Sequence, residues 1–228
     1  MIISLHMPKT AGSSFRFFLR DHFQDAVYFD YNGSPDQLSK EELEEKLEYY
    51  KASYYRFKKY YFLINKKHCI HGHFLAAKYG FYKNDKNIFI TWLRDPLERL
   101  GSHYYYWQRS YDALRSKPLH KRIIEEKWSF EKFCFSEEMH NLYSRYITDF
   151  PMENFDFIGI VEHFDDDFRY FVNKYLGMGT VQVEVRNTNP NAQESYFKNM
   201  SFYGELKEYH QNDYEFYNYA LELRKHRQ

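Results

Sequence analysis

Residues 6–15, HMPKTAGSSF, follow an apolar run over residues 2–5 and precede a helical pattern of apolar side chains. The run before them is typical of a short buried strand, and phenylalanine and leucine then recur at helical spacing. The stretch therefore predicts a turn that leaves a strand over 2–7, exposes backbone N–H groups and enters a helix over 13–23.

The rest of the chain alternates apolar runs with helical patterns in the same way. Strands are predicted over residues 27–30, 68–71, 87–95 and within 155–164, with a further candidate over 180–185. Helices are predicted after residue 39, over 97–111, from about 165 and over most of 201–227, and Ser39 with Glu42 forms a capping box for the first of these. This alternation predicts an α/β fold with a mainly parallel central sheet flanked by helices. We expect a single domain over residues 1–228 with a helical lobe at about 110–150.

Composition limits the classes of partner. The 228 residues carry a formal net charge of zero, so no global field favours nucleic acid or an anionic membrane. No stretch approaches the roughly 20 apolar residues of a membrane span, and no apolar leader precedes the first predicted strand. Cys69 and Cys134 match no disulfide framework, which favours a reducing compartment. We therefore expect a soluble, cytoplasmic protein with no membrane span and no nucleic-acid partner.

The turn PKTAGSS has the chemistry of a phosphate cradle at the carboxyl end of the first predicted strand. Gly12 permits close backbone approach, Ser13 and Ser14 add hydroxyl groups, and Lys9 adds a full positive charge beside a helix N-terminus. The ATP-type pattern G-x-x-x-x-G-K-[ST] is absent, because the lysine precedes the glycine. An ordinary strand–helix turn with a capping serine remains the alternative.

A second candidate anion site follows the predicted strand over 87–95. Arg94 lies at its end, and Ser102 comes eight residues later, about two helical turns on. The guanidinium group suits phosphate. Asp95 is a candidate helix cap, and Glu98 and Arg99 are expected to be surface or ion-pair residues. Together with the first turn, this motif predicts a ligand with two separated anionic groups.

The segment HCIHGHF concentrates His68, Cys69, His71 and His73. A zinc site is disfavoured, because no second Cys/His pair lies at zinc-finger spacing and alternate strand residues point to opposite faces. Histidine titrates near neutral pH, so one of these residues could act as a general base. Packing or polar structure is the alternative for both His71 and His73.

In order along the chain, PKTAGSSF, HGHF, ITWLRDPLERLGSHYYY and FIGIVEHFD resemble the sulfotransferase superfamily that uses 3′-phosphoadenosine 5′-phosphosulfate (PAPS). The pattern is most similar to the branch of heparan and dermatan (uronyl) 2-O-sulfotransferases. The resemblance runs from residue 1 to about 175, with a weaker likeness in YHQNDYEFYNYA near the end. It implies a P-loop-like sulfotransferase fold.

The resemblance also implies a set of site residues. The 5′-phosphosulfate of PAPS would be held by Lys9, Thr10, Ala11, Gly12, Ser13 and Ser14, and the 3′-phosphate by Arg94 and Ser102. The catalytic residues would be His73 as general base, His71 in support and Lys9 at the leaving oxygen. No metal is implied. Glu162 is the alternative base, since other branches use a carboxylate.

The expected activity is therefore enzymatic transfer of a sulfuryl group from PAPS to a hydroxyl acceptor, a glycan or a small molecule. Carbohydrate sulfation is favoured, and residues 104–107, YYYW, could stack on sugar rings or pack in the core. A late loop at Asn187, Thr188 and Asn189 could contact PAPS. The alternatives are a P-loop-like kinase that uses ATP and a nucleotide- or sugar-binding protein without catalysis.

Overall fold

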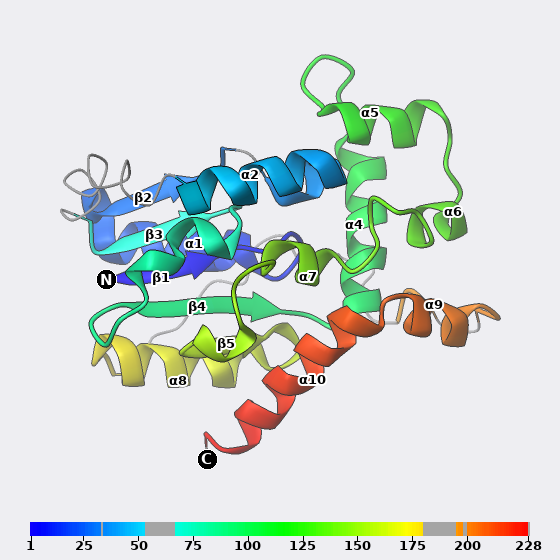
Figure 1. The fold of residues 1–228 in the computed structure, drawn as a ribbon. Helices are drawn as coiled ribbons and strands as arrows, with labels where there is room; N and C mark the ends of the chain where they lie inside the picture. The colour runs from blue at the N-terminus through cyan, green and yellow to red at the C-terminus, as the bar shows by residue number, and fades with distance from the viewer. Residues whose placement is uncertain (33, 53–66, 180–194, 198–199, 228) are drawn as a thin grey trace.

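Five parallel strands form the central sheet of this computed structural model, which describes residues 1–32, 34–52, 67–179, 195–197 and 200–227 (Figure 1). The strands are β1 (Ile2–Leu5), β2 (Val27–Asp30), β3 (Cys69–Gly72), β4 (Ile88–Leu93) and β5 (Phe157–Ile160). They lie in the order β2-β3-β1-β4-β5. The predicted α/β fold with a mainly parallel sheet is confirmed, and the strand candidate at 180–185 lies outside the described residues.

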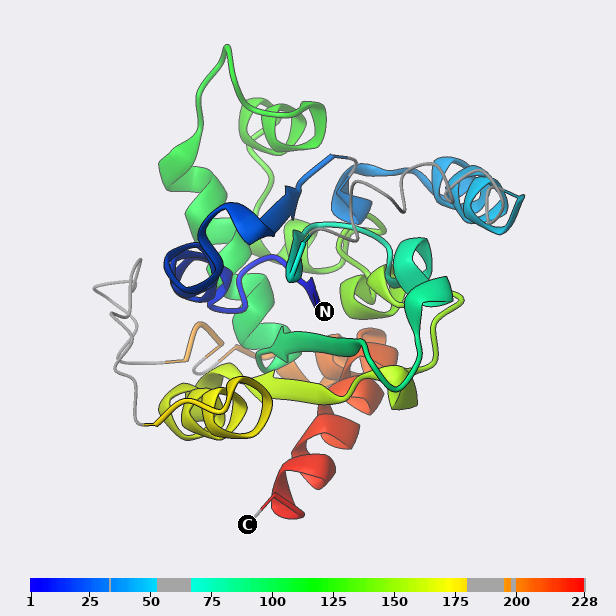
Figure 2. The ribbon, with the colours of Figure 1, turned by 90° about the vertical axis from the view of Figure 1, so that its left-hand side faces the viewer.

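Helices cover both faces of the sheet. The described α-helices are α1 (Gly12–Phe23), α2 (Lys40–Ala52), α4 (Pro96–Ser110), α5 (Pro118–Glu125), α6 (Phe130–Cys134), α7 (Leu142–Tyr146), α8 (Phe164–Leu176), α9 (Tyr203–Tyr209) and α10 (Gln211–Lys225). The 3-10 turns are η1 (Gln24–Ala26), η2 (Pro35–Gln37), η4 (Ala76–Tyr82), η5 (Met152–Asn154) and η6 (Val161–His163). Figure 2 shows α1 and α8 on one side of the sheet and α2, α7 and α10 on the other.

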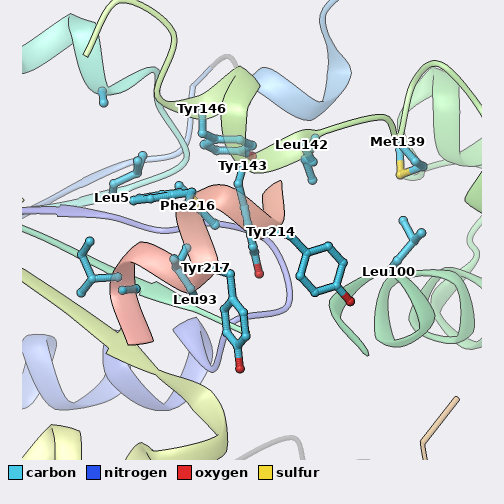
Figure 3. Close-up of a cluster of buried hydrophobic side chains, with 14 of the residues drawn as sticks. Leu5, Leu93, Leu100, Met139, Leu142, Tyr143, Tyr146, Tyr214, Phe216 and Tyr217 are labelled. Atoms are coloured by element: carbon cyan, nitrogen blue, oxygen red, sulfur yellow. The ribbon is translucent and has the colours of Figure 1, made fainter. Parts of the chain in front are cut away.

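Consecutive strand residues contribute to two different cores, because side chains alternate across a strand. Ile2 packs in the core that α1 and α8 complete, where Phe15 and Phe171 are fully buried. Ile3 and Leu5 face the larger core on the opposite side of the sheet. Figure 3 shows that larger core, in which side chains of α7 and α10 lie over the strands.

The starts of two helices have the predicted caps. Ser39 N–H donates to Glu42 Oε2 at 2.8 Å, and Glu42 N–H donates to Ser39 Oγ at 3.2 Å, which completes the capping box of α2. Asp95 Oδ1 accepts the N–H groups of Leu97 and Glu98 at 3.0 and 3.1 Å at the start of α4. These caps use neighbours in the sequence, which is why the sequence alone could place them.

The expectation that Arg99 lies at the surface is wrong. Its side chain is 0 % exposed, and its guanidinium carbon lies 5.6 Å from the centre of the Tyr143 ring. Its Nη1 lies 3.5 Å from Nδ1 of His103. The charge of Arg99 opposes the rise that burial causes in the pKa of the Asp213 carboxyl. Arg99 is buried because α10 packs against α4 and the Tyr143 ring of α7 lies beside the guanidinium group, which the sequence of α4 alone does not reveal.

The predicted helical region at about 110–150 contains α5, α6 and α7. Figure 1 shows α5 and α6 beside α4, away from the sheet. In contrast, α7 lies against the larger core, to which it contributes Tyr143 and Tyr146. Among the described residues, no helix combines the length and apolar character needed to cross a membrane. Cys69 and Cys134 are buried and form no disulfide.

Candidate functional site

The predicted motifs meet where the strand order of the sheet reverses. β1 lies between β3 and β4. The chain leaves β1 for β2 on one side, whereas it passes from β3 over β1 to β4 on the other. Open parallel sheets bind ligands beyond the carboxyl ends of strands at such a reversal. The segments that follow β1, β3 and β4 surround this point.

The loop between β1 and α1 turns tightly and leads into the N-terminus of a helix. Lys9 (φ 69°) and Ala11 (φ 57°) both adopt left-handed conformations, which bend the chain tightly. Thr10 is buried, and its hydroxyl fixes the loop by donating to the Met7 carbonyl at 2.8 Å. No side chain caps α1, so the N–H groups of its first turn lack an acceptor within the helix. The loop thus leads directly into the positive end of a helix dipole, a position that favours anions.

Gly12 allows this loop to approach the end of β1. A Cβ at this position would lie 1.6 Å from Nε2 of His6, so any larger residue would displace either the imidazole ring or the loop. Ser13 is half-buried, and Ser14 is buried at 2 % exposure. Residues 9–14, which the sequence predicts to bind phosphate, therefore form one compact turn at the end of β1.

Three cationic side chains gather beside the loop. Lys9 Nζ lies 3.8 Å from the centre of the Tyr106 ring on α4. Burial, then the charges of Arg109 and Arg94, lower the pKa of Lys9 to about 8. Ser102 and Arg109 lie four residues before and three residues after Tyr106, so these three residues share one face of α4. A cluster of positive charges that lowers the pKa of a lysine is typical of an anion-binding site.

Arg109 was not among the residues predicted from the sequence, although its helical spacing from Ser102 could have indicated it. In the aromatic run over 104–107, Trp107 is buried, as expected for a core residue. Tyr106 is 45 % exposed and supports the Lys9 ammonium group instead. Trp107 of this run therefore belongs to the core, whereas Tyr106 belongs to the candidate site.

Arg94 directly follows β4 and faces a carboxylate of the next helix, α4. Its Nη2 lies 3.8 Å from Oε2 of Glu98, and the two side chains are 20 % and 23 % exposed. The hydroxyl of Ser195 also donates to Glu98. Such a long, partly hydrated pair is weak, so a phosphate group could replace the carboxylate as the partner of Arg94.

His73 has a fixed tautomer. Its Nδ1 lies 2.7 Å from the carbonyl oxygen of His6, and a carbonyl can only accept, so the proton is on Nδ1. Nε2 is then left with a lone pair that can take a proton. Burial lowers the pKa of His73, and the charge of Asp36 and the bond to the His6 carbonyl oppose that effect. A half-buried imidazole with an unprotonated nitrogen is the state that a general base requires.

His6 contacts both His73, which directly follows β3, and the loop between β1 and α1. Its ring stacks on His73 at 4.3 Å between centroids, and its Nδ1 lies 3.1 Å from the Tyr31 hydroxyl. The same ring occupies the space beside Gly12. His6 and Tyr31 were not predicted, because their role depends on strands β1 and β2 ending near β3.

His71 lies deeper than the expected supporting residue. It is 1 % exposed, and its Nδ1 lies 2.9 Å from the Ser4 hydroxyl. Burial and the charges of His73 and Arg16 lower its pKa to about 3, so it remains neutral. Its ring stacks on His6 at 5.1 Å. His71 could therefore affect His73 only by packing against the His6 ring, which in turn stacks on His73.

Glu162, the alternative base, lies at the other end of the site. It follows β5, which is three strands from β3, or roughly 14 Å at the usual strand spacing. Its Oε1 accepts the N–H of Asp95 at 2.9 Å, and its Oε2 accepts the Tyr217 hydroxyl at 3.3 Å. This placement favours His73 over Glu162 beside the loop. The predicted contacts Asn187, Thr188 and Asn189 lie outside the described residues.

No family model matches the chain, and no curated protein matches it at a significant level. In the described part of the chain, no cluster of His, Cys, Asp and Glu side chains is arranged to hold a metal ion.

Proposed function

We propose that this protein is a sulfotransferase that moves a sulfuryl group from PAPS to the hydroxyl group of an acceptor. The observation that carries the proposal is the double contact of His6. Its carbonyl accepts the Nδ1 proton of His73, while its ring packs on Gly12 of the cationic loop. A base with an open nitrogen is thus held directly against a site for an anionic donor.

The residues beside the loop suit the two anionic ends of PAPS. The first-turn N–H groups of α1, with Lys9 beside them, would hold the 5′-phosphosulfate. Arg94, with Ser102 two turns along α4, would hold the 3′-phosphate, and Arg109 adds a third positive charge. When bound, PAPS supplies the sulfuryl group that is transferred and leaves as 3′-phosphoadenosine 5′-phosphate.

His73 and Lys9 would perform the proton and charge steps. Nε2 of His73 would accept the proton of the acceptor hydroxyl as its oxygen attacks. The Lys9 ammonium group would stabilise the negative charge that grows on the leaving oxygen. The loop would hold the reacting groups in line, which is the main task of a protein in group transfers of this kind.

The proposal extends to the acceptor and to the compartment. The acceptor is a carbohydrate or a small hydroxyl compound, because a hydroxyl group is what a histidine base can activate here. The enzyme works in the cytoplasm, where the unpaired Cys69 and Cys134 would remain thiols.

Calorimetry with nucleotides tests the donor site directly. We expect 3′-phosphoadenosine 5′-phosphate to bind much more tightly than AMP, because only the former carries a 3′-phosphate for Arg94. A hydrogen bond to a charged group contributes about 1.5–3 kcal/mol, so Arg94→Ala should weaken binding by about tenfold or more. Arg115→Ala is the control, since that side chain is 90 % exposed.

Equal affinity for the two nucleotides would remove the 3′-phosphate from the assignment. Preferential binding of ATP would favour the kinase alternative. Tight binding of the bisphosphate without turnover of radiolabelled PAPS on any acceptor would favour a binding protein without catalysis.

Nucleotide binding should be accompanied by the uptake of a proton at Lys9. Its pKa is about 8 before an anion binds, and a bound phosphate raises that pKa. Well below pH 8 Lys9 is already protonated, so its titration should not change nucleotide affinity. Above pH 8 nucleotide binding must add a proton to Lys9, so nucleotide affinity should fall as the pH rises. Calorimetry at pH 8 in buffers of different ionisation enthalpy should show uptake of a fraction of a proton.

The same measurement at pH 6 should show little uptake by Lys9. The variant Lys9→Met should lose the uptake at pH 8. If Lys9→Met takes up as many protons as the wild type, another group titrates and the charge assignment of the loop is wrong.

A further inference from the structure

Three ring side chains occupy the same position on three neighbouring strands. His6, Tyr31 and His73 directly follow β1, β2 and β3. These strands lie side by side in the order β2-β3-β1 (Figure 1), and their last residues are in register. The three rings therefore meet beyond the carboxyl ends of the strands, where β1 leads into the cationic loop.

Contacts on several sides hold the Tyr31 ring. Its centre lies 4.9 Å from the centre of the His73 ring, and its hydroxyl oxygen lies 3.1 Å from Nδ1 of His6. The guanidinium carbon of Arg16, on α1, lies 4.9 Å from the centre of the Tyr31 ring. These contacts limit the positions that the Tyr31 hydroxyl can take relative to His6.

The Tyr31 hydroxyl is the better donor of its pair with His6. A phenol O–H is far more acidic than the N–H of a neutral imidazole, and the imidazole nitrogen is the stronger acceptor. Burial raises the pKa of Tyr31 to about 12, which keeps the proton on its hydroxyl. Burial, then the charges of His73 and His71, hold the pKa of His6 well below its usual range, so the His6 ring is neutral. A neutral ring that accepts a hydrogen bond at Nδ1 carries its proton on Nε2.

Nε2 of His6 lies against the first residue of α1. It is the atom closest to the position that a Cβ of Gly12 would take, and α1 begins at Gly12 without a side-chain cap. Among the described residues, the Tyr31 hydroxyl is the only hydrogen-bond partner of the His6 ring, so no group there accepts the Nε2 proton. The ring thus places an N–H donor beside the end of a helix that favours anions.

We propose that the His6 side chain is a further residue of the donor site: its Nε2–H, in the tautomer that the Tyr31 hydroxyl fixes, donates to an oxygen of the 5′-phosphosulfate. The inference rests on the proposed sulfotransferase function. It goes beyond that function because it gives the His6 ring a bond to the ligand. Since the donor is neutral, it does not oppose protonation of the His73 ring 4.3 Å away, as a cation in its place would.

The tautomer of His6 can be measured without any ligand. Long-range proton–nitrogen NMR spectra distinguish protonated from unprotonated ring nitrogens, and the signals that disappear in His6→Gln are those of His6. We expect Nδ1 to be unprotonated and Nε2 to be protonated in the wild-type protein. Tyr31→Phe keeps the ring but removes the O–H donor, so the Nδ1 signal should move toward that of a nitrogen without a hydrogen bond. Tyr49→Phe, at an exposed tyrosine of α2, should leave the signal unchanged.

A matched pair of substitutions at residue 6 tests the bond to the anion. The amide of glutamine places an N–H group near the position of Nε2, whereas the shorter asparagine reaches only the position of Nδ1. Both substitutions keep the backbone carbonyl that His73 contacts. In calorimetry, His6→Asn should weaken binding of 3′-phosphoadenosine 5′-phosphate by about tenfold or more, and His6→Gln should keep the affinity within about threefold of the wild type.

Adenosine 3′-phosphate is the control ligand, because it lacks the 5′-phosphate that His6 is proposed to contact. His6→Asn should leave its affinity unchanged. A purely structural role of His6 would instead weaken the binding of both nucleotides.

A proton on Nδ1 of His6 in the wild-type protein would overturn the inference. So would wild-type affinity of His6→Asn for the bisphosphate, equal losses for the two nucleotides, or a loss in His6→Gln as large as that in His6→Asn. Each of these results leaves the cationic donor site standing. If the wild-type protein binds neither nucleotide, the proposed function itself fails, and this inference fails with it.

Discussion

Replacing His73 by alanine is expected to lower the rate of sulfuryl transfer by about 10²–10⁴-fold, the usual cost of losing a general base. The reason is geometric, because the His6 carbonyl holds the Nδ1 proton and leaves Nε2 as the acceptor. Transfer of label from radiolabelled PAPS to the acceptor measures the loss. Affinity for 3′-phosphoadenosine 5′-phosphate should be almost unchanged, since His73 is assigned no contact with the nucleotide.

His68→Ala is the matched control for this experiment, because His68 is an exposed histidine directly before β3. It should keep wild-type activity. His71→Ala should lose less activity than His73→Ala, because His71 is buried behind the His6 ring. If His73→Ala remains active while Glu162→Ala does not, the base is a carboxylate and the proposed mechanism is wrong at its centre.

Replacing Lys9 by methionine should lower kcat by about 10²–10³-fold, comparable to the loss of one donor at a developing negative charge. Methionine keeps much of the length of the side chain and removes its charge. A charge that interacts chiefly with the transition state affects kcat more than nucleotide affinity. Steady-state kinetics with varied PAPS, together with calorimetry for the product nucleotide, separates the two effects.

Lys86→Met is the matched control, since Lys86 is exposed in the loop before β4, at the opposite edge of the sheet. It should leave both kcat and KM at wild-type values. A Lys9→Met variant with wild-type kcat and a raised KM for PAPS would show that Lys9 only anchors the ground state. The proposed stabilisation of the leaving oxygen would then have to come from the N–H groups of α1 or from Arg109.

The parts of the site that the sequence predicted are those encoded within one short segment. The turn at Lys9 and Gly12 follows β1 and begins α1, and the glycine is needed because the His6 ring leaves no room for a Cβ. Arg94 and the Asp95 cap likewise belong to a single strand–helix junction. Their roles depend on neighbours a few residues away, so spacing and residue type were sufficient.

The parts that the sequence could not predict depend on contacts between distant segments. Arg109 matters because α4 turns its face toward Lys9, and its charge then depresses the Lys9 pKa. The charge of Asp36 raises the pKa of His73, although the two residues belong to different segments. Tyr146, far along the chain, donates to Asp36 Oδ1, and its ring lies 6.4 Å from the ring of His73. Residues that act through such contacts leave no local periodicity or spacing to detect.

The sequence by itself determined the α/β class, the main strand and helix boundaries, and the place of a lysine-bearing turn that is predicted to hold an anion. Hydrophobic periodicity, caps and glycine are local properties, and local physics suffices to interpret them. Only the tertiary structure decided that Arg99 is buried and that His71 lies behind His6. It also decided that the start of α1, which no side chain caps, and the open nitrogen of His73 meet at one edge of the sheet. That meeting follows from the strand order, which places the ends of β1, β3 and β4 side by side although long stretches of chain separate them.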